Sequence, residues 1–350
     1  MTFEKRRLAE ADMGYAVYQL DILGQTRPIA ASEAHGPAVV FEGPQLEPRV
    51  IATEPGGTMG FAPVPGHDDM LFIITEFYPI FKAEAAGIHL YRAVEGLAKP
   101  WDGERIIDLP FVHRIMTIPT PLGDYLVAAT VCGGKEYQED WSKPGTVFAY
   151  LIQPELSGPW EPMPILESIH RNHGLSLGTV DGVESLLVSG TEGLFALAVP
   201  GSTDGEGAEV DPWRAITILD HEVSEMGLID LDGDGVSELV VIEPFHGDEL
   251  AVYKNGSSGW KKVYSAELGF GHGLSVGHLK GEPVAVVGNR AGSKDLVCYR
   301  AVPGEQFTME PIVVDHGAAT AGTTITATAQ GDGIVSSNPE FGEYAFYLAQ

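Results

Sequence analysis

Cysteine is nearly absent from this sequence. Among 350 residues there are two, Cys132 and Cys298, and each lies in or beside an apolar run. Two isolated cysteines provide neither a disulfide framework nor the paired spacing of a zinc site. We therefore expect two buried thiols, a pattern that favours a cytoplasmic location.

Basic residues are also scarce. The sequence has 21 Lys and Arg residues against 49 Asp and Glu residues, which gives a formal net charge of −28. Binding to phosphates requires a basic face, and this composition supplies few residues to build one. A nucleic-acid partner is therefore not expected.

Long hydrophobic segments are missing as well. The first residues, MTFEKRRLAEADMG, include basic side chains, but no apolar segment follows them. This start has neither the pattern of a signal peptide nor that of a membrane span. We expect a chain that is soluble as given and has no membrane partner.

Helical periodicity is the last thing the sequence lacks, because no stretch keeps an apolar period of 3.6 residues over three turns. Instead, 43 glycines and 24 prolines recur at short intervals. This spacing is typical of many short strands joined by tight turns. The length would allow two average domains, but all-β architectures commonly reach it as one unit.

Internal repeats are the strongest signal present. The segments NHGLSLGTVDGVESLLVSGTEGLFALAV, EMGLIDLDGDGVSELVVIEPFHGDELAVYK and GHGLSVGHLKGEPVAVVGNRAGSKDLVCYR each have the pattern of strand, turn, apolar strand, polar loop and strand. A fourth strand follows, as in PWRAITILD. Units of roughly 50 residues match one four-stranded propeller blade. The first strands of seven such units begin near Met13, Met59, His113, His173, Met226, His272 and Ala321.

A regular series of aromatic residues supports this count. The fourth strands open on Trp101, Trp160, Trp213, Trp260 and Phe307, and Phe3 precedes Met13 in the same way. The last unit, TTITATAQGDGIVSSNPEFGEYAFYLAQ, has three strands, which leaves an edge that residues 2–10 can pair with. We therefore predict an all-β chain that forms one seven-bladed β-propeller domain over residues 1–350, with the N-terminal strand completing the last blade.

The predicted blades sort side chains onto two faces. The loops between blades share one face with the loops between second and third strands, while the turns between first and second strands lie opposite. Eight of the 11 histidines fall on the first face: His35, His113, His170, His173, His221, His246, His272 and His316. Cationic, aromatic and amide groups and one carboxylate accompany them, among them Tyr78, Lys82, Arg114, Lys135, Tyr137, Trp141, Lys143, Arg171, Asn289, Arg290, Lys294, Asn338 and Glu340. Such a set of groups suits an anionic or polyhydroxylated ligand.

Three first strands begin with a histidine. Because equivalent positions of a ring point toward one axis, His113, His173 and His272 are candidate ligands of one divalent transition metal, to which Glu225 adds an oxygen. The alternative is that these imidazoles only donate hydrogen bonds to backbone carbonyls at the rim.

The opposite face carries the turn DLDGDGVSE. The side chains of Asp230, Asp232, Asp234 and Glu238, with the carbonyl of Val236, supply oxygen ligands at alternate positions, as calcium prefers. We predict a structural Ca²⁺ in this blade only, since the matching turns elsewhere lack the carboxylates. The alternative is a turn rich in solvated aspartates.

The repeats and this DxDxDG turn resemble the FG-GAP, or VCBS, repeat family, although the turn itself is present only at Asp230 to Glu238. Propellers of that family include integrin heads, lectin-like modules and carbohydrate-active lyases and dehydratases. The histidine-rich rim looks more like the seven-bladed sugar lyases and the aldos-2-ulose dehydratase propeller. The resemblance implies a carbohydrate partner, anionic or a keto-sugar.

We therefore expect a metal-dependent lyase that performs β-elimination on a uronate-containing glycan or keto-sugar. Cations and the metal hold the carboxylate or keto oxygen, a histidine removes the adjacent proton, and a tyrosine protonates the leaving oxygen. The candidate bases are His35, His170 and His246, and the candidate acids are Tyr78 and Tyr137. The candidate substrate-binding residues are Arg114, Arg171, Arg290, Asn289, Trp141 and Lys135.

Two other functions stay open. A glycoside hydrolase needs two facing carboxylates, for which Glu225, Glu243, Asp140 and Glu340 are the candidates. A non-catalytic propeller would instead bind a glycan or protein through the loop CGGKEYQEDWSKPG, with a sugar stacked on Trp141. The same loop is equally consistent with a solvated insertion.

Overall fold

The computed structural model describes residues 1–79, 82–304 and 306–350. These residues form seven four-stranded antiparallel sheets, each made of strands consecutive in the chain except the last, which has the order β1-β28-β27-β26. The chain is a seven-bladed β-propeller, as the repeats predict. It divides into two compact units: unit 1 comprises residues 1–20, 26–54 and 224–350, and unit 2 comprises residues 21–25 and 55–223.

Unit 1 holds most of the first blade and the last three. The first blade has β2 (Gly14–Ile22), β3 (Gln25–Ser32), β4 (Ala38–Glu42) and β5 (Glu47–Ala52), and the fifth has β18 (Glu225–Ile229), β19 (Glu238–Glu243), β20 (Glu249–Gly256) and β21 (Gly259–Glu267). The sixth has β22 (Gly271–Leu279), β23 (Glu282–Asn289), β24 (Leu296–Val302) and β25 (Thr308–Asp315). The seventh has β26 (Gly322–Thr328), β27 (Gly331–Asn338), the 3-10 turn η2 (Pro339–Phe341), β28 (Glu343–Ala349) and β1 (Phe3–Glu10).

Unit 2 holds the second, third and fourth blades. The second has β6 (Phe61–Val64), β7 (His67–Thr75), the 3-10 turn η1 (Ala83–Ala85), β8 (Gly87–Arg92) and β9 (Asp102–Asp108). The third has β10 (Val112–Ile118), β11 (Tyr125–Thr130), β12 (Gly145–Leu151) and β13 (Met163–Ile169). The fourth has β14 (Leu175–Val180), β15 (Val183–Gly190), β16 (Gly193–Ala198) and β17 (Ala215–Leu219).

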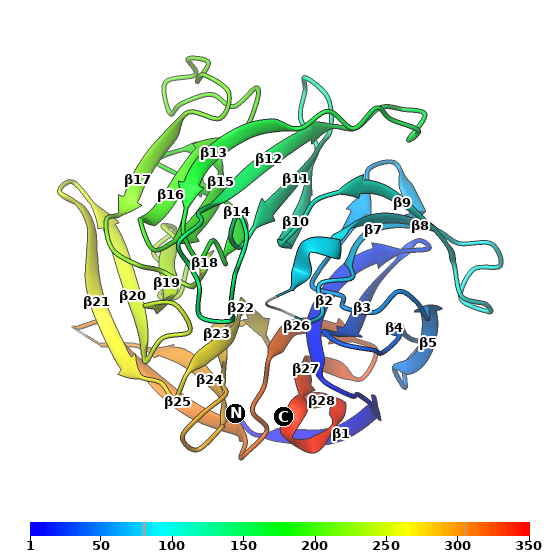
Figure 1. Ribbon diagram of the computed structural model, residues 1–350. Coiled ribbons are helices and arrows are strands. Elements are labelled where there is room, and N and C mark those ends of the chain that lie inside the picture. The colour runs from blue at the N-terminus through cyan, green and yellow to red at the C-terminus, as the bar shows by residue number, and fades with distance from the viewer. Residues whose placement is uncertain (80–81, 305) are drawn as a thin grey trace. The chain divides into compact units, whose positions relative to one another are not determined.

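The two chain ends meet within the seventh blade. β1 pairs antiparallel with β28, from Phe3 opposite Ala349 to Glu10 opposite Glu343. In Figure 1 the blue β1 lies alongside the red β28. The predicted closure by residues 2–10 is confirmed, and it removes the edge that three strands would leave open.

The core consists of apolar side chains packed between neighbouring sheets. In unit 2 Val127 and Val147 of the third blade share a buried cluster with Leu186 and Leu197 of the fourth. In unit 1 Val240 and Val252 of the fifth blade pack in the same way on blade six. Second and third strands are therefore nearly continuous apolar runs, because both of their faces are covered.

Both cysteines lie in this core. Cys132 and Cys298 are unbonded thiols, 1% and 0% exposed. Burial raises the pKa of both thiols, that of Cys298 to about 12. Both thiols are therefore buried as predicted, and neither has the lowered pKa that activates a cysteine nucleophile.

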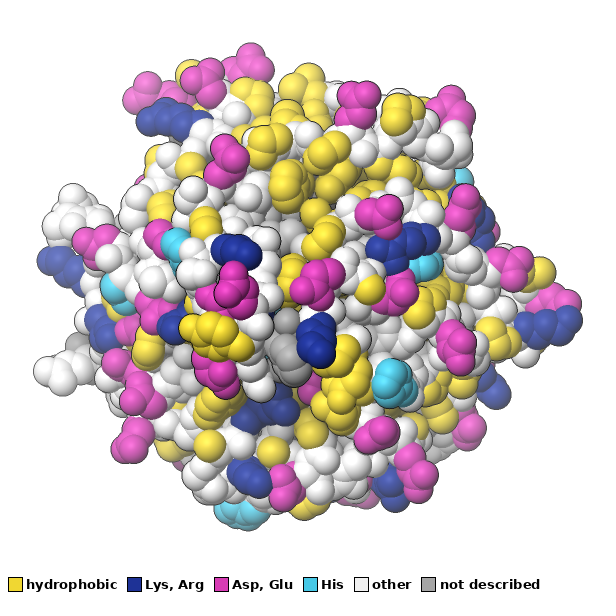
Figure 2. Space-filling model, viewed as in Figure 1, with side chains coloured by type: hydrophobic (Ala, Val, Ile, Leu, Met, Phe, Trp, Pro, Cys, Tyr) yellow, Lys and Arg dark blue, Asp and Glu magenta, His cyan; other side chains and the backbone are white. Residues whose placement is uncertain are grey.

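Most charged side chains lie on the surface, although a few carboxylates such as Glu238 and Glu243 are buried. On the face drawn in Figure 2, acidic side chains are scattered among lysines and arginines. In the described part of the chain, no helix has the length and apolar character that a membrane span requires.

Candidate functional site

In every blade one end carries both the start of the first strand and the end of the second, because consecutive strands are antiparallel. We call this the histidine end of a blade. The loops before the first strands contain or adjoin His113, His170, His173, His221, His272 and His316, and the loops after second strands contain His35 and His246. His67 and His278 lie at the opposite ends, at the turns between first and second strands.

In unit 2 two predicted metal ligands are neighbours. The imidazole ring centroids of His113 and His173 are 4.7 Å apart, and the residues are 4% and 2% exposed. His113 lies at an irregularity in the pairing of β10 with β11, between Val112 and Arg114. Such a bulge turns a side chain out of the regular alternation. Local backbone irregularity thus positions one member of this histidine pair.

A cation lies beside that pair. Arg114 Nη1 is 3.4 Å from His113 Nε2 and donates to the His113 carbonyl oxygen at 3.3 Å. A guanidinium group only donates hydrogen bonds. A hydrogen bond from Arg114 Nη1 to His113 Nε2 therefore uses the lone pair of Nε2. Arg171 Nη1 donates to Glu222 Oε1 at 2.9 Å, which anchors this second predicted substrate-binding cation.

His170 has the surroundings of an oriented base. Its Nδ1 is 2.6 Å from Glu192 Oε1, and its backbone N–H donates to Glu192 Oε2 at 2.8 Å. The His170 side chain is 35% exposed. A carboxylate on Nδ1 fixes the tautomer in which Nε2 carries the lone pair. Glu192, which the sequence did not single out, therefore orients the imidazole of His170, whose role as a base stays a prediction.

The loop of the third blade is largely exposed, but hydrogen bonds to one buried carboxylate order part of it. Asp140 accepts hydrogen bonds from the backbone N–H groups of Glu136 and Ser142, both at 3.0 Å, and from the Ser142 hydroxyl at 2.7 Å. These bonds lower the pKa of Asp140 to about 2. Asp140 is thus the structural centre of the loop.

Trp141 in this loop is already covered. Lys135 Nζ lies 3.1 Å from the centroid of its ring, and Arg171 Cζ lies 5.8 Å away. Burial lowers the pKa of Lys135, and the Cys132 and Asp140 side chains oppose that effect. The predicted stacking of a sugar on Trp141 therefore requires the other face of the ring or displacement of Lys135. The two candidate acids, Tyr78 and Tyr137, are 38% and 60% exposed.

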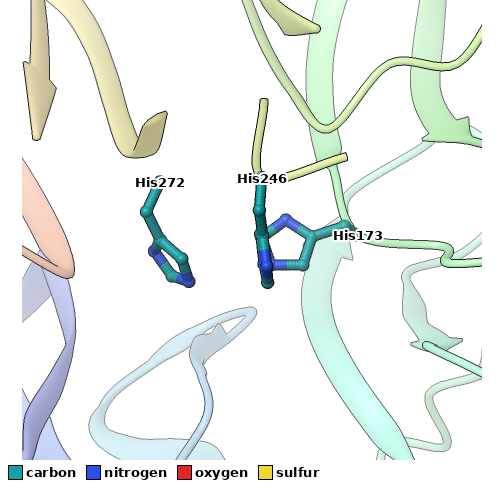
Figure 3. A group of neighbouring side chains, drawn as sticks. All are labelled: His173, His246 and His272. Carbon is teal, nitrogen blue, oxygen red and sulfur yellow. The ribbon is translucent and has the colours of Figure 1, made fainter. Parts of the chain in front are cut away.

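In unit 1 His272, one of the three predicted histidine ligands, lies beside a histidine that the prediction did not include among the ligands. The rings of His246 and His272 have centroids 4.8 Å apart, and Figure 3 shows both imidazoles extending in the same direction from separate segments. His246 thus lies beside a predicted ligand, although the sequence placed it among the bases. The third residue drawn there, His173, belongs to unit 2 and is described above.

His272 is held in one tautomer. Its Nδ1 is 2.7 Å from the carbonyl oxygen of Ala321, so Nδ1 carries the proton and Nε2 the lone pair of the neutral ring. The ring also packs edge-on to Tyr15, at 5.2 Å between centroids. As at His113, the strand pairing is irregular here, between Gly271 and Leu274.

The remaining predicted groups of unit 1 have mixed surroundings. Asn289 accepts from Gly269 N–H and donates to the Asp295 carbonyl, so its amide braces a loop. Glu225 is half-buried at the start of β18, and His35 is exposed. Glu33 in the same loop as His35 was missed, although burial raises its pKa against the opposing charge of Arg290.

The carboxylates proposed for a hydrolase are largely engaged elsewhere. Glu243, 5% exposed, accepts from the Tyr253 hydroxyl at 3.0 Å and from Lys262 at 2.5 Å. Glu340 pairs with Lys294 at 2.6 Å, and Asp140 braces its loop. The hydrolase interpretation gains no support from these contacts.

The imidazole pairs fit the chemistry of a transition-metal site in part. Neutral imidazole is a common metal ligand, and a carbonyl accepting from the other ring nitrogen, as at His272, is the usual second partner. Each unit by itself supplies two neighbouring imidazoles, and that of His272 has a carbonyl partner. The acidic turn lies at the other end of the fifth blade, where ligand oxygens of Asp230, Asp232 and Glu238 are within 4.8 Å of one another.

Comparison with known proteins supports the propeller class. The chain is similar to a crystal structure of BBS1N in complex with ARL6DN, with a TM-score of 0.57 and 12% identity over 99% of this chain and 95% of that one. It is also similar to the Cps50 (Swd1) β-propeller domain of Myceliophteria thermophila, with a TM-score of 0.56 and 11% identity over 99% of this chain and all of that one. At such identities the likeness shows the fold alone. No family model and no curated protein matches the sequence, so the resemblance to FG-GAP repeats stays a prediction.

Proposed function

We propose that the protein binds an anionic sugar or keto-sugar at the histidine ends of its blades and cleaves it by β-elimination. The observation that carries this proposal is the buried imidazole pair of His113 and His173 with Arg114 beside it, in a chain of strongly negative net charge. Two imidazoles and a guanidinium gathered in one place favour an anionic ligand.

The chemistry assigns a role to each group. Arg114 and Arg171 hold the carboxylate of a uronate, which acidifies the neighbouring carbon. The Nε2 lone pair of His170, oriented by Glu192, takes the proton from that carbon. The electrons of the broken C–H bond form a C=C bond as the C–O bond one carbon further breaks. An exposed tyrosine, Tyr78 or Tyr137, gives its proton to the leaving oxygen.

A divalent metal bound by the imidazoles of His113 and His173 would polarise the same carboxylate or keto oxygen. This part of the proposal is tested by metal analysis of the purified protein and of His173→Ala. We expect bound metal to be lost with that histidine, and equal metal content in both would exclude the imidazole pair as ligands.

The reaction is tested by ultraviolet absorbance. β-Elimination leaves an unsaturated uronate or enone that absorbs, so incubation with galacturonate- and glucuronate-containing glycans and with keto-sugars should generate signal. We expect His170→Ala to lower the rate by about 10²- to 10⁴-fold. The matched control is His67→Ala, an exposed histidine at the opposite end of a unit 2 blade, which should keep the wild-type rate.

Other outcomes would identify the competing functions. New reducing ends without absorbance would contradict elimination and indicate a hydrolase. Binding without either signal would indicate a non-catalytic glycan-binding propeller. This is the second candidate function, and the cluster of Lys135, Trp141 and Arg171 supports it.

A further inference from the structure

The turn between β18 and β19 uses half of its carboxylate oxygens on its own backbone. Asp230 Oδ1 and Oδ2 accept from the N–H groups of Gly233 and Gly235, at 2.7 and 2.9 Å. Asp234 Oδ1 accepts from Val236 N–H at 2.8 Å, and Glu238 Oε2 accepts from Leu231 N–H at 2.7 Å. These bonds shape the loop and leave one oxygen each of Asp234 and Glu238 for another partner.

That partner is an amine of the same blade. Lys254 Nζ is 2.5 Å from Asp232 Oδ2, 3.0 Å from Asp234 Oδ2 and 3.2 Å from Glu238 Oε1. An ammonium ion has three donors, so this set can satisfy all of them. The amine thus contacts two of the three residues, Asp232 and Glu238, whose oxygens, with those of Asp230, lie close enough together to hold a metal ion.

The strand pairing explains why Lys254 lies next to the acidic turn. β20 pairs antiparallel with β19, with Tyr253 opposite Leu239, so Lys254 lies one step further along, next to Glu238. The third strand therefore delivers its lysine to the end of the blade where the acidic turn lies. The local pattern of the turn does not indicate Lys254, because this contact depends on the register between strands.

Burial affects the pKa of both Glu238 and Lys254. Glu238 is 1% exposed, and burial raises its pKa although Leu231 N–H and Lys254 counteract that effect. Burial would lower the pKa of Lys254, but its hydrogen bonds to the three carboxylates outweigh it and raise the pKa. The buried carboxylate and the ammonium stabilise each other's charged forms.

We propose that the ammonium group of Lys254 is the resident cation of this turn, so that the turn keeps its fold without a metal ion. A calcium ion would have to displace the amine from the oxygens it contacts. The DxDxDG pattern therefore marks a lysine-stabilised turn in this chain, and the calcium predicted from that pattern is not required.

The test compares wild type with Lys254→Met, which keeps the length of the side chain and removes its charge. The matched control is Lys261→Met, the exposed residue opposite Lys254 on β21. We expect the melting temperature of wild type and of Lys261→Met to be the same in calcium and in chelator. Lys254→Met should melt at a lower temperature in chelator and recover in calcium, with saturation at one ion per chain.

A second measurement needs no variant. Acetylation of lysines in the wild-type protein, followed by mass spectrometry, should find Lys254 modified at least tenfold more slowly than Lys261, with the ratio unchanged by calcium. Stoichiometric calcium binding to wild type together with faster acetylation of Lys254 in calcium would overturn the proposal.

Discussion

Single residues decide the local geometry of the candidate site. His113 and His272 both lie where the pairing of a first strand is irregular, and both imidazoles are buried. The sequence predicted that both residues lie at the histidine ends of their blades. It could not predict the partners of each ring, because a bulge of one residue changes where a side chain points without leaving a signal in the repeat pattern.

Asp140 offers a test at this scale. Hydrogen bonds lower its pKa to about 2 from an ordinary value of 3.8, so the folded protein favours the ionised form. The stabilisation is present above the unfolded pKa and is lost as the pH falls through about 4 to about 2. Asp140→Asn should therefore lower the melting temperature at pH 7.

The control for this prediction is Glu139→Gln, an exposed neighbour in the same loop. We expect thermal melts of the control to match wild type at every pH. The deficit of Asp140→Asn should shrink as the pH falls below about 4, because the wild-type carboxyl is then protonated as well. A deficit that is constant with pH would show that the carboxylate charge does not brace the loop.

At the scale of strands, the sequence was most informative. The predicted starts of the seven first strands lie within two residues of the observed ones, as for His113 against Val112 and His173 against Leu175. Periodic apolar runs and turn residues are local features, so they can be recognised from the sequence alone. Contacts such as that of Lys254 with the acidic turn depend on register between strands, which local patterns do not specify.

Lys5 of the closing strand β1 pairs with two carboxylates of the last two blades. Lys5 Nζ lies 2.7 Å from Asp315 Oδ2 and 2.7 Å from Glu343 Oε1, and the Glu343 side chain is 8% exposed. Lys5→Met should lower the free energy of unfolding by about 1–3 kcal/mol, because it removes the nearer of the two cations, Lys5 and Arg7, that pair with the buried Glu343 carboxylate. Denaturant unfolding measures this loss.

The control for the closing strand is Lys99→Met. Lys99 pairs with Glu95 on the surface, with both side chains more than half exposed, so its removal should cost less than about 0.5 kcal/mol. Equal losses for the two variants would mean that the ion pairs of β1 do not contribute to closure.

Close packing of first strands gives another prediction. A Cβ atom on Gly322 of β26 would lie 2.1 Å from the carbonyl oxygen of Tyr15. A Cβ atom on Gly256 would have no heavy atom within 4 Å outside its own residue and chain neighbours. Gly322→Ala should therefore destabilise the protein by about 1–3 kcal/mol, and Gly256→Ala should be close to neutral. Chemical denaturation of both variants measures the difference, and a neutral Gly322→Ala would contradict the packing of these strands.

At the scale of the whole molecule, the sequence predicted the fold in more detail than the candidate site. The number of blades, their four strands and the closure by the N-terminal strand follow from repeats and are confirmed. The site could be predicted only as a set of residues at shared ends of blades. The pairs His113 with His173 and His246 with His272 depend on side-chain positions that equivalent places in a repeat do not fix.

The central claim is that the histidine end of unit 2 binds an anionic sugar. Nuclear magnetic resonance of ¹⁵N-histidine-labelled protein, titrated with a uronate oligosaccharide, tests it most directly, with signals assigned by His-to-Ala variants. We predict that the imidazole signals of His113, His170 and His173 shift together and saturate, while the signal of His67 stays in place. Saturable binding that leaves all three signals unmoved would contradict the account.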